Sequence, residues 1–155
     1  MKLFLDSTYL FPACNVDITE GWSKSDLKEL LKLDDYTLFY SDLSLFEIYT
    51  KCMKLILQKK INVEIKSIQK GIQTILNSPK LHRINWWENI FESDIIYYLK
   101  EMHNDSIDCT LFYLAAVNCD IFATFDNKLI KISRENQKIR TFINEKIGRA
   151  SCRER

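Results

Sequence analysis

The sequence predicts an α/β domain with a three-layer α/β/α arrangement around a mostly parallel central sheet of about four to five strands. Short apolar runs recur along the chain, and between them lie longer stretches with apolar residues at helical spacing. The chain has 155 residues, of which 46% are hydrophobic, with only three glycines and two prolines. This length and composition fit one domain with a substantial core.

The first half of the chain predicts two strands, each followed by helical segments. Residues 2–5 are an apolar run that ends at Asp6, and residues 37–40 are a second such run. Serines placed before apolar-periodic stretches act as helix caps. In chain order we expect a strand at 2–5, a short helix or turn at 7–15, a helix at 25–31 capped by Ser23 or Ser25, a strand at 37–40, a helix that Ser41 caps and that carries Leu45, Ile48, Cys52, Leu55 and Ile56, and a helix at 63–76.

The second half repeats this alternation after the breaker Asn77-Ser78-Pro79. The stretch 106–118 is apolar almost throughout, which is typical of a buried helix. We expect a short strand at 81–85, helices at 86–102 and 106–118, a strand at 120–124, a short helix at 129–134 and a last strand at 139–143. No internal repeat or linker is visible, so residues 1–146 are interpreted as a single domain.

Composition excludes several classes of protein. No apolar run approaches the length of a membrane span, and the acid at position 6 interrupts any signal-peptide core. The five cysteines are scattered without a CxxC pair, which favours buried thiols over disulfides or a zinc site. These features predict a cytoplasmic protein.

The last nine residues, 147–155, differ in composition from the rest of the chain. They can be back-translated into a common sequencing adapter, so we interpret them as an artefact of a reading frame that runs beyond its genomic fragment. A natural basic tail is the alternative interpretation. The segment is left out of the fold prediction.

Charge is distributed unevenly, although the formal net charge is only +1. Residues 51–70 and 127–146 are basic, whereas residues 1–50 and 71–126 are acidic. The lysines of the first basic segment are by default a solvated helix face. The alternative is a surface that contacts the phosphates of a nucleic acid.

Acidic residues follow the strands. Asp6 ends the first strand, Asp126 follows the strand at 120–124, Glu47 lies in the helix after the second strand, and Asp105 and Asp108 open the helix before the fourth. Parallel sheets form their sites at the carboxyl ends of strands. Two carboxylates about 4 Å apart repel by roughly 4 kcal/mol, so such a cluster requires a shared proton or a divalent cation. Oxygen-only ligands favour Mg²⁺ or Mn²⁺. Taken singly, Asp6 and Asp126 are better interpreted as helix N-caps, whereas taken together the acids at one sheet edge favour a metal site.

Four segments carry a resemblance to a known family. Leu5-Asp6-Ser7-Thr8-Tyr9-Leu10 resembles the opening of a PIN domain, Leu43-Ser44-Leu45-Phe46-Glu47-Ile48 resembles that family's second acidic motif, and Ile107-Asp108-Cys109-Thr110 with Thr124-Phe125-Asp126 resembles its third and fourth. The resemblance covers residues 2 to about 143, and it rests on the order and spacing of these motifs. PIN domains are metal-dependent ribonucleases, and many small ones resemble the toxins of VapBC toxin–antitoxin pairs.

The resemblance implies an acidic quartet of Asp6, Glu47, Asp108 and Asp126. Asp6, Asp108 and Asp126 would bind Mg²⁺ or Mn²⁺, and Glu47 would orient or deprotonate the attacking water. Ser7 or Thr8, together with Thr124, match hydroxyl positions that orient the site. Asp105 is either a helix cap, which we favour, or an outer ligand. The implied partners are an RNA substrate, an antitoxin protein and a second copy of the chain.

Other interpretations stay open. The chain could be a PIN-domain RNA-processing nuclease outside toxin systems, or a catalytically silent RNA- or protein-binding module of the same fold. A phosphotransfer enzyme or receiver domain also places acids at strand ends, but no lysine directly follows Thr124. His82 and His103 form no ligand pattern. His103, just before Asp105, could contact the substrate, but we favour a position at the surface. Trp86-Trp87 is more typical of packing than of base stacking.

Overall fold

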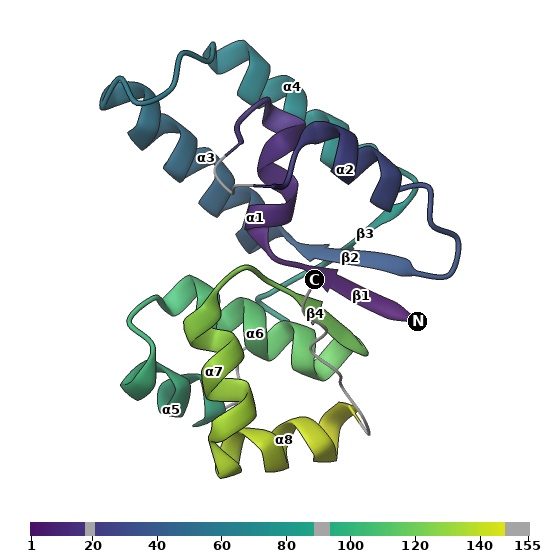
Figure 1. Ribbon diagram of the computed structural model, residues 1–155, viewed down its shortest axis with the longest axis vertical. Helices are drawn as coiled ribbons and strands as arrows, with labels where there is room; N and C mark the ends of the chain where they lie inside the picture. The colour runs from purple at the N-terminus through teal and green to yellow at the C-terminus, as the bar shows by residue number, and fades with distance from the viewer. Residues whose placement is uncertain (18–20, 89–93, 148–155) are drawn as a thin grey trace.

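The fold is a three-layer α/β/α sandwich (Figure 1). In the computed structural model, which describes residues 1–17, 21–88 and 94–147, the central sheet has four strands, all parallel. The strands are β1 (Lys2–Leu5), β2 (Thr37–Ser41), β3 (Leu81–Ile84) and β4 (Ile121–Ala123). The α/β class and the parallel sheet are therefore confirmed.

The strand order is β3-β2-β1-β4, so the chain changes direction at β1. It first builds outward from β1 through β2 to β3, and then returns to add β4 on the other side of β1. Phe4 is paired with Phe39 of β2 on one side and with Phe122 of β4 on the other. Such a switch point leaves a crevice outside the carboxyl ends of the two diverging strands.

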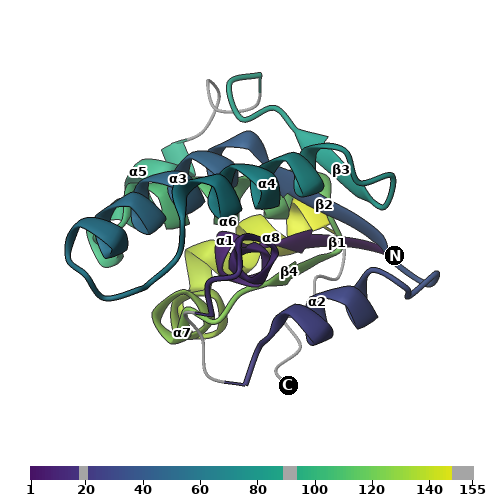
Figure 2. The same ribbon diagram turned by 90° about the horizontal axis from the view of Figure 1, so that it is seen from above.

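Helices cover both faces of the sheet (Figures 1 and 2). One layer contains α1 (Ser7–Leu10), the 3₁₀ turn η1 (Phe11–Cys14), α2 (Lys24–Leu30), α3 (Asp42–Leu57) and α4 (Ile65–Leu76). The other contains α5 (Asp94–Met102), α6 (Ser106–Asn118), α7 (Asn127–Glu135) and α8 (Gln137–Ile147). No helix in these ranges is long and apolar enough to cross a membrane.

Each face of the sheet has its own core, because successive strand side chains point to opposite faces. Leu3 and Leu5 pack against the α1–α4 layer, whereas Phe4 between them packs against the α5–α8 layer. The apolar helix predicted at 106–118 is α6, which lies in the second core. Four cysteines are buried free thiols: Cys14, Cys52, Cys109 and Cys119.

The predicted helix at 86–102 is wrong in its first part. Residues 86–88 form a turn, and the helix observed in this region is α5, from Asp94; residues 89–93 lie outside the described ranges. The backbone N–H of Trp86 donates to Asp42 Oδ1 at 3.3 Å, and that of Trp87 donates to Asn85 Oδ1 at 3.1 Å. These side-chain acceptors stabilise a turn at the end of β3 and compete with helix formation.

The predicted last strand at 139–143 is also wrong, because these residues belong to α8. A short apolar run does not distinguish a strand from a buried helix. Here Ile139, Phe142 and Ile143 have the i, i+3, i+4 spacing of a helix face, and all three pack into the core around α6. The backbone N–H of Ile139 donates to Asn136 Oδ1 at 3.1 Å, which supports the start of the helix.

Gly71 of α4 provides a test of how tightly the first layer packs. A Cβ atom at this position would lie 2.6 Å from Ala13 O and from the Cα and Sγ atoms of Cys14. Glycine-to-alanine changes inside helices usually stabilise a protein by about 1 kcal/mol. We expect Gly71→Ala instead to destabilise the protein by roughly 1–3 kcal/mol, because the added methyl overlaps backbone atoms of η1.

Chemical denaturation of Gly71→Ala and of the exposed control Gln73→Ala would measure this effect. The control should stay within about 0.5 kcal/mol of the wild type, as surface substitutions usually do. A stabilised Gly71→Ala protein would contradict the close approach of α4 and η1.

Candidate metal centre

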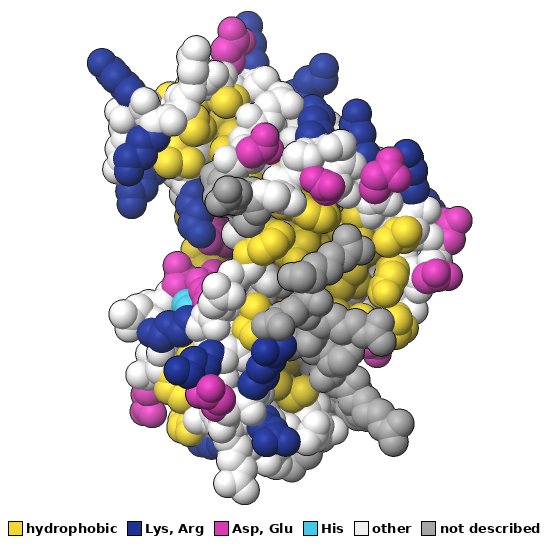
Figure 3. Space-filling view, in the orientation of Figure 1, with side chains coloured by type: hydrophobic (Ala, Val, Ile, Leu, Met, Phe, Trp, Pro, Cys, Tyr) yellow, Lys and Arg dark blue, Asp and Glu magenta, His cyan; other side chains and the backbone are white. Residues whose placement is uncertain are grey.

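The predicted acidic residues gather at the switch point between β1 and β4. Asp6 directly follows β1, Asp126 follows β4, Glu47 lies in α3, and Asp108 lies in the first turn of α6. Figure 3 shows acidic side chains and a histidine in a hollow between the two helical layers. The site therefore draws on both layers and on both strands that flank the crevice.

Asp6 has the most hydrogen-bonded carboxylate of the four. Its Oδ1 atom accepts the backbone N–H of Ser7 at 2.7 Å and so caps α1. Its Oδ2 atom accepts the hydroxyls of Thr8 at 3.0 Å and Thr124 at 2.9 Å. The side chain is buried, and burial together with the nearby charge of Glu47 raises the pKa of Asp6 to about 6 against these hydrogen bonds. Thr8 and Thr124, the hydroxyl residues noted in the sequence, therefore both contact the Asp6 carboxylate.

Glu47 is almost fully buried, with 1% of its surface exposed. Lys51, one helical turn later, forms an ion pair with its Oε1 atom. The Oε2 atom accepts no hydrogen bond from the described part of the chain. A buried carboxylate oxygen without a donor is costly, which indicates that this position is suited to an additional cation or proton.

Asp108 shares the same space without serving as a cap. Burial, followed by the charges of Asp105, Asp6 and Glu47, raises the pKa of Asp108 to about 7, while Lys51 opposes this shift. Asp105 is the N-cap of α6, since its Oδ1 atom accepts the backbone N–H of Ile107 at 2.8 Å and of Asp108 at 3.4 Å. The preferred assignment of Asp105 as a helix cap is confirmed.

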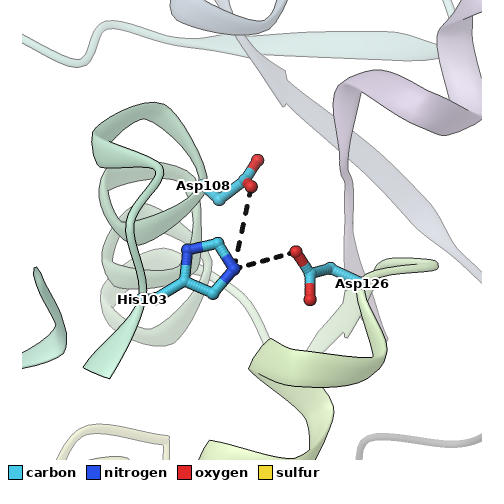
Figure 4. Close-up of side chains that lie close together, drawn as sticks. All are labelled: His103, Asp108 and Asp126. Atoms are coloured by element: carbon cyan, nitrogen blue, oxygen red, sulfur yellow. Dashed lines mark hydrogen bonds and ion pairs between the residues drawn. The ribbon is translucent and has the colours of Figure 1, made fainter.

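Asp126 faces His103, which also lies near Asp108 (Figure 4). Its Oδ1 atom caps α7 by accepting the N–H groups of Lys128 at 2.7 Å and Leu129 at 2.9 Å. Its Oδ2 atom lies 2.9 Å from His103 Nε2. Partial burial would raise the pKa of Asp126, but the hydrogen bonds from Leu129, His103 and Lys128 outweigh it and hold that pKa below its ordinary value.

His103 lies beside the acids, and the sequence predicted neither its burial nor its contact with Asp126. The surface position expected for it is wrong, because only 5% of the residue is exposed. The backbone N–H of Asp105 donates to Nδ1 at 3.3 Å, so this nitrogen is an acceptor. A neutral ring with Nδ1 as acceptor carries its proton on Nε2, which then donates to Asp126. The single residue between His103 and Asp105 is the signal that could have placed it near the site.

Two overlapping groups of side chains have ligand atoms within 4.8 Å of one another: Asp6, Glu47 and Asp108, and His103, Asp108 and Asp126. The first group fits a hard cation such as Mg²⁺ or Mn²⁺, because its donors are all carboxylate oxygens and Glu47 Oε2 lacks a partner. The second group fits less well, because metal binding at His103 Nε2 would move the ring proton to Nδ1, against the N–H of Asp105.

The structure thus brings the acids together in a different combination from the expected metal set of Asp6, Asp108 and Asp126. Asp108 belongs to both groups, whereas Asp6 and Asp126 belong to one each. Thr124 connects these two, because its hydroxyl donates to Asp6 Oδ2 and accepts the backbone N–H of Asp126 at 3.0 Å. Glu47, which was expected to act on water, lies among the candidate ligands.

No protein family model matches this chain, and a search of curated proteins finds no matching relative.

The variant Asp108→Asn tests whether the charge of Asp108 destabilises the metal-free protein. In the folded protein the pKa of Asp108 is about 7, whereas the value in an unfolded chain is about 3.9. Between these values the folded state binds more protons, so this group's contribution to stability decreases as the pH rises. In a chelator we expect the variant and the wild type to be similar below about pH 4, and the variant to be more stable by ~2 kcal/mol at pH 8.

Added Mn²⁺ should reverse that order, because a ligand that binds only the native state stabilises it by about 2.7 kcal/mol at a hundredfold excess over Kd. Thermal melts with chelator and with Mn²⁺ measure both effects. Asp35→Asn, at an exposed carboxylate, is the control. Equal Mn²⁺ shifts in all three proteins would exclude Asp108 as a ligand.

Proposed function

We propose that this protein is a Mg²⁺- or Mn²⁺-dependent endoribonuclease that hydrolyses phosphodiester bonds in RNA. The observation that carries the proposal is the convergence of the buried carboxylates of Asp6, Glu47 and Asp108 at the switch point, with one oxygen of Glu47 lacking a donor. Three carboxylates in such a space require positive charge, and divalent cations with oxygen ligands are common in enzymes that cleave phosphodiesters.

Asp6, Glu47 and Asp108 would hold the cation. When bound, it would acidify a water molecule and neutralise charge on the scissile phosphate. The hydroxyls of Thr8 and Thr124 donate to the Asp6 carboxylate and fix its orientation. Among the described residues, Asp6 forms no ion pair with a lysine or arginine. Asp126 keeps its charge at the edge of the site, where His103 orients it, and would attract or position the attacking water.

RNA as the substrate, and a role as the toxin of a toxin–antitoxin pair, come from the resemblance of the acidic motifs to small PIN domains. An antitoxin protein, homodimerisation and a cytoplasmic location belong to the same proposal. Basic segments on both sides of the site are compatible with a polyanionic substrate, since residues 51–70 and 127–146 carry most of the excess lysine and arginine.

Cleavage of RNA should depend on the cation and on each of the clustered acids. We expect Asp6→Asn, Asp108→Asn and Asp126→Asn to reduce the rate at least about a hundredfold, because each weakens charge stabilisation of the transition state. The measurement uses the purified chain, end-labelled structured RNAs, and either Mg²⁺, Mn²⁺ or chelator. Asp35→Asn serves as a matched exposed control.

Full activity in any two of the three site variants would refute the acidic site as the catalytic centre. Cleavage that persists in chelator would refute the metal dependence.

Expression of the chain alone in a bacterial host tests the toxin assignment separately. We expect growth arrest with the wild type and normal growth with Asp108→Asn at equal protein level, because arrest by a nuclease requires its active site. Normal growth with a wild-type protein that cleaves RNA in vitro would reject the toxin role and leave the nuclease in place.

A further inference from the structure

Lys51 carries a cationic side chain that reaches the acidic cluster from the same helix as Glu47. We propose that Lys51 is the internal counter-ion of this cluster, and that a divalent cation displaces its ammonium group from Glu47 when it binds. The inference rests on the proposed metal centre. It assigns to Lys51 a competing role that sets the affinity of the centre for its cation.

The geometry of the ion pair is asymmetric. The Glu47 side chain is 2% exposed, whereas the Lys51 side chain is 42% exposed, so one partner is fixed in the interior and the other reaches solvent. Lysine has a long flexible stem with its charge at the end. Lys51 can therefore leave Glu47 by rotating toward water, while Glu47 cannot follow it.

The position of the charge supports competition with a cation. Glu47 belongs to the group whose carboxylate oxygens lie within 4.8 Å of one another with those of Asp6 and Asp108. The ammonium of Lys51 also interacts with the charges of Asp108 and Asp6, so it partly neutralises the whole group. A divalent cation held by the same three carboxylates would repel this ammonium at short range.

Other lysines do not share this arrangement. Lys54 lies on the same helix but is exposed, and no ion pair with a carboxylate is found for it in the described structure. Among the described residues, Lys51 is the only lysine or arginine paired with an acid of the quartet, and the other partner is the imidazole of His103. Lys54→Met is therefore a matched control for removing a lysine charge from α3.

Calorimetric titration with Mn²⁺ at pH 8 tests the proposal on the full chain. We expect Lys51→Met, which keeps the aliphatic stem, to bind Mn²⁺ about tenfold more tightly than the wild type, because the competing charge is gone. Lys54→Met should bind like the wild type. In a Glu47→Gln background, Lys51→Met should change the affinity little, since the pair that anchors the ammonium is already absent.

Displacement itself is measured in the wild-type protein by NMR with ¹³C-labelled lysine. On addition of Mg²⁺ the Cε signal of Lys51 should move toward the position of solvated lysines such as Lys54. This measurement decides the question even if Lys51→Met does not fold.

Equal or weaker Mn²⁺ binding by folded Lys51→Met, or a Lys51 signal unchanged at saturating Mg²⁺, would overturn the role of Lys51 and leave the metal centre standing. Absence of Mn²⁺ binding by the wild type and both lysine variants would overturn the metal centre and this inference together.

Discussion

The burial of the Asp6 carboxylate at the end of β1 is the constraint on which the fold and the site both depend. The backbone N–H of Asp6 donates to Ala123 O at 3.0 Å and extends the pairing of β1 with β4. Its side chain starts α1 and is bound by hydroxyls from both sides of the crevice. An isolated charge in such a place would be expelled or neutralised. The hydrogen bonds keep it in position, and the raised pKa shows that they offset only part of the cost of burial.

Helix capping holds the carboxylates of Asp6 and Asp126 in place through one oxygen and leaves the other oxygen to face the site. Asp6 and Asp126 each spend Oδ1 on backbone N–H groups at a helix start and direct Oδ2 to another polar group. The two interpretations of these residues, cap or site, are therefore compatible. Glu47 and Asp108 lie within helices, and no backbone donor in the described part of the chain stabilises their charge. Their neutralisation therefore depends on Lys51, a proton or a cation.

Much of this arrangement could be predicted from the sequence because it is local. Short apolar runs marked β1 and β2, and Ser23, Ser41 and Asp105 marked the starts of helices. Residues 139–143 were wrongly predicted as a strand, because so short an apolar run fits both a strand and a helix face until its neighbours are known. The strand order and the burial of His103 depend on contacts between distant segments, and no local pattern encodes them. Lys51 lay one turn after Glu47 in the sequence, but its pairing became visible only once Glu47 was known to face the interior.

The pKa of Asp108 is raised whereas that of Asp126 is lowered, so the two carboxylates differ in how readily they hold a proton. Asp126 remains ionised, because backbone N–H groups and His103 stabilise its charge whether or not a cation is present. Burial and the neighbouring acids raise the pKa of Asp108 to about 7, so near neutral pH it holds a proton far more readily than an exposed aspartate. The single positive charge of Lys51 does not return the pKa of Asp108 to its ordinary value, so full ionisation of the three carboxylates requires additional positive charge. A divalent cation would supply it and would release the proton of Asp108, so cation affinity must rise with pH through this range. If the proposed cation binds here, the same carboxylate would affect both the stability of the metal-free fold and the pH dependence of cation binding.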